Sequence, residues 1–204
     1  MKTRNYDKKD GFRVWLSHQD TDHLLSLVED EPRRRLAFEL GLAGLRTDEV
    51  THVTLADFKP LTDDTDAYLI EIHESKTEPR EVPVPPALEQ RARMLKSATR
   101  QRKDDPLVDV GNRQVRNWVR DVRDPLQEAT GDEAAQHLGM HDLRRTWATD
   151  TFYTLSFNGV PNAEPLTMAW GGWAMTESGR ATFRQNYLGP VPNHVAAQAV
   201  DVLW

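Results

Sequence analysis

The sequence contains no cysteine. This absence excludes disulfide scaffolds, cysteine-ligated zinc fingers and cysteine nucleophiles. No apolar run approaches the roughly 18 residues that a transmembrane helix needs, and the polar N-terminus lacks the apolar core of a secretory signal. With 204 residues, the chain is long enough for one domain with a sizeable core, which we expect to be cytoplasmic and without a membrane partner.

Lysine is scarce, with 7 residues against 19 arginines, and the charges are unevenly distributed. The formal net charge of −6 by itself argues against a nucleic-acid partner. Net charge is a weak guide, however, where charges are segregated. Residues 91–103 hold six basic side chains and no acidic one, whereas residues 57–78 hold seven acidic side chains and two lysines. A local basic surface is therefore compatible with the acidic total.

Hydrophobic patterning predicts a mainly α (α+β) fold. The charged start without periodicity predicts a tail or linker over 1–18, followed by one domain over 19–204. Three short apolar runs predict a small three-stranded antiparallel sheet from 53–55, 67–73 and 81–84, with a hairpin at 76–79. A first helix of about ten residues should follow a cap at Asp20 or Thr21. The other expected helices are 33–42, 87–98, 111–129, 141–156, 164–170, 178–187 and 193–203.

Two charged residues in the first half of the domain could carry chemistry. Arg46 closes an apolar helix, where its guanidinium needs hydrogen-bond partners. Glu49, three residues on, can supply one, so an ordinary salt bridge at a helix end is an alternative. Lys76 falls within Ser-Lys-Thr at the expected hairpin tip, where a lysine commonly blunts a sheet edge. Neither feature carries a functional conclusion alone.

The second half contains two histidines, an arginine, a tryptophan and a tyrosine of interest. His141 and Arg144 lie on one face of the expected helix, an arrangement that suits a phosphate. His137 and His141 could instead ligate zinc, but no glutamate stands between them as in the zinc-protease motif. Trp173 follows two glycines, and Tyr187 comes near the end of a short expected helix. Taken alone, such a tyrosine is more often a core residue.

The order of these features resembles the tyrosine recombinase (phage integrase) family. After an apolar helix come Gly-Leu-Arg-x-x-Glu, Ser-Lys-Thr, His-x-x-Arg, Gly-Trp and a tyrosine, with 98 residues from Arg46 to Arg144 and 43 from Arg144 to Tyr187. The resemblance spans roughly residues 24–203 and implies a helical catalytic domain with a small antiparallel sheet. Two departures stand out. Thirteen residues separate Trp173 from Tyr187, a few more than expected, and the family's N-terminal core-binding domain is not evident.

The resemblance implies a role for each matching position. Glu49 matches the acidic residue that supports the first arginine, and no metal or other cofactor is implied. A source in a salt-adapted archaeon or its virus would explain the bias toward arginine and aspartate, and a GC-rich genome would explain it equally well. The implied catalytic residues are Arg46, Lys76, His141, Arg144, Trp173 and Tyr187.

DNA binding would require a local basic surface. Four arginines recur at i, i+3, i+7 and i+10 on one face of the helix expected at 111–129, either as phosphate contacts or as a solvated helix face. The apolar side chains of the C-terminal helix, among them Val195 and Val202, should pack on a neighbouring subunit, or alternatively on the same chain. The candidate DNA-binding residues are Arg113, Arg116, Arg120 and Arg123.

The predicted function is that of a site-specific DNA recombinase or integrase. It would cleave and rejoin double-stranded DNA through a 3′-phosphotyrosine intermediate, without metal or ATP, as a homo-oligomer on DNA. The alternative is a non-cleaving DNA-binding accessory or regulatory protein that retains the fold. A metal-dependent hydrolase is a third possibility and rests only on His137 and His141.

Overall fold

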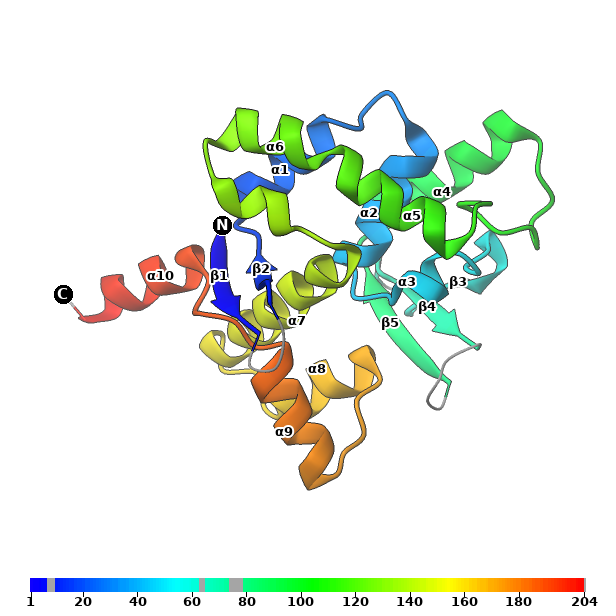
Figure 1. Ribbon diagram of the computed structural model, residues 1–204. Helices are drawn as coiled ribbons and strands as arrows, with labels where there is room; N and C mark the ends of the chain where they lie inside the picture. Colours follow the sequence, from blue (N-terminus) through cyan, green and yellow to red (C-terminus); the bar gives the residue numbers. More distant parts are fainter. Residues whose placement is uncertain (7–9, 63–64, 74–78, 204) are drawn as a thin grey trace.

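The computed structural model describes residues 1–6, 10–62, 65–73 and 79–203, and Figure 1 shows how its elements are arranged. The helices are α1 (His18–Ser26), α2 (Pro32–Leu42), α3 (Thr47–Val50), α4 (Pro86–Thr99), α5 (Asn112–Asp121), α6 (Arg123–Thr130), α7 (Met140–Phe157), α8 (Ala163–Gly171), α9 (Glu177–Asn186) and α10 (Asn193–Leu203), with short 3₁₀ helices η1 (Leu55–Asp57) and η2 (Glu133–His137). The strands are β1 (Lys2–Asn5), β2 (Phe12–Trp15), β3 (Phe58–Pro60), β4 (Tyr68–Ile72) and β5 (Arg80–Val84). The prediction of a mainly helical fold with a small antiparallel sheet is confirmed.

The three-stranded sheet has the order β3-β4-β5, with antiparallel pairs throughout. Its first strand was predicted at 53–55, and that prediction is wrong. Thr54 caps η1: its hydroxyl accepts the backbone N–H of Ala56, while the carboxylate of Asp57 accepts the backbone N–H of Thr54 at 2.8 Å. This local alternative satisfies the backbone within a tight turn, so the three-stranded sheet begins only at Phe58.

The described residues of the segment 1–18 are ordered parts of the fold, so the prediction of a loose tail or linker is also wrong. β1 and β2 form an antiparallel hairpin, and Val14, Trp15 and Leu16 are buried. The backbone N–H of Val14 donates to Asp142 of α7 at 3.1 Å. Among the described charged side chains of this segment, Arg4 and Asp10 are exposed and Arg13 is buried, whereas β2 packs against α7.

Two helix boundaries also differ from the predictions, for local reasons. α1 begins after Ser17, whose hydroxyl and the carboxylate of Asp20 form a reciprocal capping box, so Asp20 is the third residue of the helix rather than its cap. The single helix expected at 111–129 is divided into α5 and α6 at Val122. Pro125 follows three residues later; it has no N–H to donate, and its ring excludes the carbonyl of Asp121.

α7 is the central element and packs against α2, α8, β2 and α10. A large apolar core extends from β2 and α1 through α2 and the sheet to α6 and the start of α7. A second, smaller cluster joins Ala148, Met168, Trp173 and Phe183, from α7, α8 and α9 and the segment between the last two. α10 extends away from the rest of the chain in Figure 1. Within the described part of the chain, no helix is both long and apolar enough to span a membrane.

Candidate active site at the end of helix α8

The C-terminal end of α8 binds three arginines that come from distant parts of the chain. Arg46 donates to the carbonyls of Gly172 at 2.9 Å and Gly171 at 3.5 Å, and Arg144 also donates to Gly171. Arg80 donates to the carbonyl of Trp170 at 2.8 Å. The last carbonyls of a helix lack partners within it and form the negative end of its dipole. The end of α8 is therefore suited to holding cations.

The Gly-Gly-Trp sequence makes this geometry possible. Gly172 ends α8 with φ of +68°, in the left-handed region that favours glycine. A Cβ atom on Gly171 would lie 1.9 Å from the ring of Trp173. The indole therefore packs directly over the helix end, which a residue with a side chain at position 171 would prevent.

Glu49 binds two of the three arginines. Arg80 binds its carboxylate with both terminal nitrogens, at 2.6 and 2.7 Å, and Arg46 binds it with a guanidinium nitrogen at 2.7 Å and the backbone N–H at 2.6 Å. Burial disfavours the charged carboxylate, but the hydrogen bonds and charge of Arg80, together with those of Arg46, outweigh it and lower the pKa of Glu49 to about 2. The pairing with Arg46 that the spacing indicated is present, and Arg80 adds to it.

Arg144 is the deepest cation of the site. Its side chain is fully buried, with its guanidinium carbon 4.4 Å from the ring centroid of Trp173 and 5.7 Å from that of Tyr187. Burial, and next the charge of Arg46, lower the pKa of Arg144 to about 9, so it stays protonated at neutral pH. Of the three guanidinium groups, those of Arg46 and Arg80 bind the carboxylate of Glu49, whereas that of Arg144 donates to the backbone carbonyls of Gly44 and Gly171.

Tyr187 follows α9 and lies among aromatic side chains. Its ring meets that of Trp173 edge-on at 4.5 Å between centroids, and that of His141 at 5.1 Å. Tyr187 is half-buried, whereas His141 is exposed at the start of α7. The structure therefore brings together His141, Arg144, Trp173 and Tyr187, and the shared carbonyl of Gly171 adds Arg46.

The backbone around Tyr187 is held by the N-terminal hairpin and by α7. The carbonyl of Tyr187 accepts hydrogen bonds from Nε1 of Trp15 and from the hydroxyl of Thr149, both at 2.9 Å. Arg145 donates from Nε to the carbonyl of Asn186 at 3.0 Å. The residues that the sequence assigned to a tail thus position the backbone of the candidate nucleophile.

The four arginines predicted to bind DNA do not all lie on one helix. Because the helix is divided at Val122, Arg123 opens α6, where it donates to a backbone carbonyl at 2.8 Å. Arg116, Arg120 and Arg123 line an open groove of about 580 Å³ together with His141, whereas Arg113 does not line it. The prediction of a single continuous stripe is therefore wrong, but three of its members lie beside the candidate site.

Lys76, predicted as catalytic, lies outside the described residues. His137 lies in η2, with its ring 4.5 Å from that of Phe12, and lines the same groove as His141. In the part of the chain that the structure describes, these two histidines are not among the groups close enough to share a metal ion with a third ligand.

Arg80 is the residue of the site that the sequence analysis missed. It begins β5 and shares the buried face of that strand with Val82 and Val84. The alternation Arg-x-Val-x-Val was a usable signal, because it places an arginine on an apolar face, where it needs a carboxylate. Glu49 supplies that carboxylate from a residue 31 positions earlier.

No protein-family model matches the chain, and no curated protein matches its sequence. Solved structures do match. The XerA recombinase superposes with a TM-score of 0.61 at 20% identity, over 93% of this chain and 65% of that one. The Tn1549 transposon integrase in complex with transposon right end DNA gives 0.64 at 14%, over 98% and 68%. The XerH site-specific recombinase bound to difH substrate gives 0.62 at 15%, over 100% and 58%.

These similarities define the fold. The chain has the fold of tyrosine recombinase catalytic domains, a helical domain with a small three-stranded antiparallel sheet. It spans between about half and two thirds of the length of the recombinases it matches.

Proposed function

We propose that this protein is a site-specific DNA recombinase or integrase that cleaves and rejoins double-stranded DNA through a 3′-phosphotyrosine intermediate. The observation that carries the proposal is the position of Tyr187, whose ring lies 5.7 Å from the guanidinium carbon of Arg144 and 5.1 Å from the ring of His141. A phenol beside a buried cation and an exposed imidazole combines a nucleophile with groups that bind a phosphate and transfer a proton.

The chemistry proceeds without an external energy source. The hydroxyl of Tyr187 gives its proton to His141 while its oxygen forms a bond to phosphorus, the bond from phosphorus to the 5′ oxygen breaks, and the leaving oxygen takes up a proton. A 5′ hydroxyl then reverses the reaction, so the energy of the original bond is preserved in the phosphotyrosine. Lys76 is proposed as the acid that protonates the leaving oxygen.

Arg46 and Arg144 would stabilise the transition state. Negative charge accumulates on the non-bridging oxygens during the attack, and guanidinium groups that remain charged can bind these oxygens. Arg46 is the more accessible of the two, with 21% of its side chain exposed. Arg144 packs against the ring of Trp173 and adds its positive charge from the interior. The buried positive charge of Arg144 beside Tyr187 favours a phosphodiester at this position.

The protein is proposed to bind DNA through the groove of Arg116, Arg120 and Arg123, because this groove contains His141 and so leads to Tyr187. We further propose that copies of the chain assemble on DNA through α10. Three apolar side chains near the end of α10 are exposed, and covering them on a second copy would remove apolar surface from water. They are Val200, Val202 and Leu203.

A covalent-adduct assay tests the proposal. Wild-type protein is incubated in EDTA with a pool of nicked duplexes of randomised sequence, and DNA that stays attached to protein is measured on a denaturing gel. The expected result is a band from the wild type and none from Tyr187→Phe, because only the nucleophilic oxygen is lost. Tyr153→Phe, in α7, is the matched control and should retain the band.

Three outcomes would overturn the mechanism: an equal band from Tyr187→Phe, a band from the wild type that disappears with EDTA, or no band from a wild type that binds the DNA. The last outcome would instead support the non-cleaving DNA-binding protein.

A further inference from the structure

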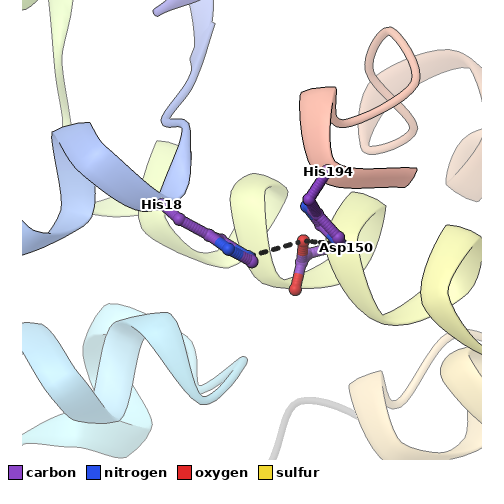
Figure 2. A group of neighbouring side chains, drawn as sticks. All are labelled: His18, Asp150 and His194. Atoms are coloured by element: carbon purple, nitrogen blue, oxygen red, sulfur yellow. Dashed lines mark hydrogen bonds and ion pairs between the residues drawn. The ribbon is translucent and has the colours of Figure 1, made fainter. Parts of the chain in front are cut away.

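Three side chains from separate parts of the sequence meet on the side of α7 that faces α10. His18 comes from the first turn of α1, Asp150 from the middle of α7 and His194 from the first turn of α10, and Figure 2 shows both rings directed at the carboxylate. One ligand atom from each lies within 4.8 Å of the others. From these residues we propose a binding site for a divalent transition-metal ion, with Zn²⁺ as the type ion.

The distances favour a shared metal ion over two simple ion pairs. Nε2 of His18 lies 3.3 Å from Oδ1 of Asp150, and Nε2 of His194 lies 3.5 Å from the same oxygen. Charge-assisted hydrogen bonds are shorter, about 2.7–2.9 Å. Ligand bonds of about 2.0–2.2 Å in a tetrahedron separate ligand atoms by roughly 3.3–3.5 Å. Each of the two pairs that include Asp150 shows this separation, and the two histidine nitrogens lie within 4.8 Å of each other.

The arrangement of the two imidazoles points the same way. Their rings are stacked, with centroids 4.2 Å apart and 19° between planes. A neutral imidazole can direct either its Nε2–H or its Nε2 lone pair at the carboxylate of Asp150. With the lone pairs of both rings directed there, a cation among the three atoms would bind both rings and the carboxylate together.

The ligand set indicates the kind of ion. Two imidazoles and one carboxylate suit zinc and related transition metals, whereas calcium and magnesium prefer oxygen ligands. The group borders a cavity of about 350 Å³ that is also lined by Ser17 and Gln19, so a fourth ligand position can take water. Lys2 also lines this cavity, and its amine is held by a hydrogen bond of 2.5 Å to the carbonyl of Val191.

Metal binding would fasten the start of α10 to the body of the protein. Within the described chain, α10 has a single buried apolar side chain, Val195, and its far end is exposed. Coordination through His194 would add a strong link at its first turn, to α7 through Asp150 and to α1 through His18. The strand-transfer chemistry proposed above does not use these three residues.

Zinc titration of the untagged full chain tests the site. Isothermal titration calorimetry in chelator-free buffer should show one bound Zn²⁺, and each of His18→Gln, Asp150→Asn and His194→Gln should weaken binding more than tenfold. His73→Gln is the matched control, because His73 is also an exposed histidine with two nearby carboxylates, at 3.6 and 3.7 Å. This control should bind zinc as the wild type does.

Two measurements on the wild type protect the test against a variant that fails to fold. Zinc should shift the ring proton resonances of His18 and His194 in the NMR spectrum and leave those of His73 unchanged. It should also slow amide hydrogen exchange in the first turns of α10. The proposal is overturned if one equivalent of zinc does not bind, if folded cluster variants bind it normally, or if zinc shifts other histidines instead. The covalent-adduct assay compares wild type with Tyr187→Phe in EDTA, where neither protein holds a metal ion, so that comparison does not depend on zinc binding.

Discussion

Glu49 balances the charges of the candidate site, because its carboxylate accepts hydrogen bonds from both Arg46 and Arg80 while being only 3% exposed. Removing one member of a buried ion pair leaves the other charge without compensation, which costs more than the net contribution of the pair. At the scale of single residues, the stability of the site therefore depends on keeping this carboxylate ionised.

Glu49→Gln should destabilise the protein in a pH-dependent way. The pKa of Glu49 is lowered from 4.5 in the unfolded reference to about 2, so its contribution is fully present above about pH 4.5 and is lost as the pH falls toward 2. The shift corresponds to a contribution on the order of 3 kcal/mol at pH 7. Urea unfolding of wild type and variant at pH 7 and pH 3 measures it. The gap between the two proteins should be larger at pH 7, and a gap that grows toward pH 3 would contradict the assignment.

Gly171→Ala should displace Trp173. The added Cβ would fall 1.9 Å from the indole ring, so the ring or the end of α8 must move, at a cost of about 1–3 kcal/mol. Gly111→Ala is the control, because a Cβ there meets nothing within 4 Å. Thermal unfolding and tryptophan fluorescence should change for the first variant and hardly for the second. Equal stability of the two variants would mean that Trp173 does not pack on Gly171.

Among the elements, the β1–β2 hairpin connects the start of the chain to the candidate nucleophile. Trp15 reaches the carbonyl of Tyr187, and Arg13 donates to the side chain of Asn186 at 2.9 Å. The hairpin thereby supports the last turn of α9, whose own hydrogen bonds end there. Its contribution is one of position, because these contacts are made to the backbone and to a neighbouring residue rather than to the hydroxyl.

Trp15→Phe should slow formation of the covalent adduct by about tenfold, because a small misplacement of a nucleophile is costly. The substitution keeps a ring in the core and removes the N–H that binds the carbonyl of Tyr187. Thr3→Ala, an exposed position in the same hairpin, is the control. DNA affinity should change little in either variant, while the melting temperature should fall for Trp15→Phe, because the smaller ring leaves a cavity in the core, and hardly for Thr3→Ala. A rate loss matched by an equal loss of DNA affinity would argue against a positioning role.

α5 and the start of α6 form the basic wall of the groove beside His141. Arg116→Ala combined with Arg120→Ala should weaken binding to all DNA sequences alike and reduce the slope of log K against log salt by about 1.8, since each phosphate contact contributes about 0.9. Arg113→Ala, outside the groove, serves as the comparison. Fluorescence anisotropy across a salt series measures the slopes. An unchanged slope in the double variant would place the DNA surface elsewhere.

On the scale of the whole molecule, α10 differs from the other helices of the described chain in exposing three large apolar side chains, where no other helix exposes more than one. Val195 is 4% exposed, whereas Val202 and Leu203 are 80% and 72% exposed. Apolar side chains at such exposure contribute almost nothing to the folding of a single copy, but they are available to a second one. The first turn of α10 is therefore packed on the same chain, whereas the apolar side chains of its last turn are available to a second copy.

Replacing Val200, Val202 and Leu203 with serine should prevent assembly on DNA without changing the melting temperature of the single copy. The reason is that these side chains are exposed in one copy and would be buried only between copies. Gln198→Ser, an exposed polar position on the same helix, is the control. Analytical ultracentrifugation with DNA measures the assembly. Normal assembly of the triple variant would show that α10 does not mediate it.

Much of the fold was predictable because helices depend on nearby residues. Apolar spacing and the prolines and glycines between segments placed α2, α4 and α7 to α10 to within a residue or two, since a helical hydrogen bond joins residues only four apart. The division at Val122 was also encoded locally, in Pro125. The order and spacing of Arg46, His141, Arg144 and Tyr187 indicated the fold class.

The tertiary structure decided which charged and exposed-looking residues belong to the interior. Arg80 is buried only because Glu49 reaches it from 31 residues away, and Trp15 is bound to Tyr187 across 172 residues. His18, Asp150 and His194 form a group only once α1, α7 and α10 are packed. Burial of a polar side chain depends on a partner that compensates its lost hydration, and such a partner is selected by packing between distant segments rather than by the local pattern.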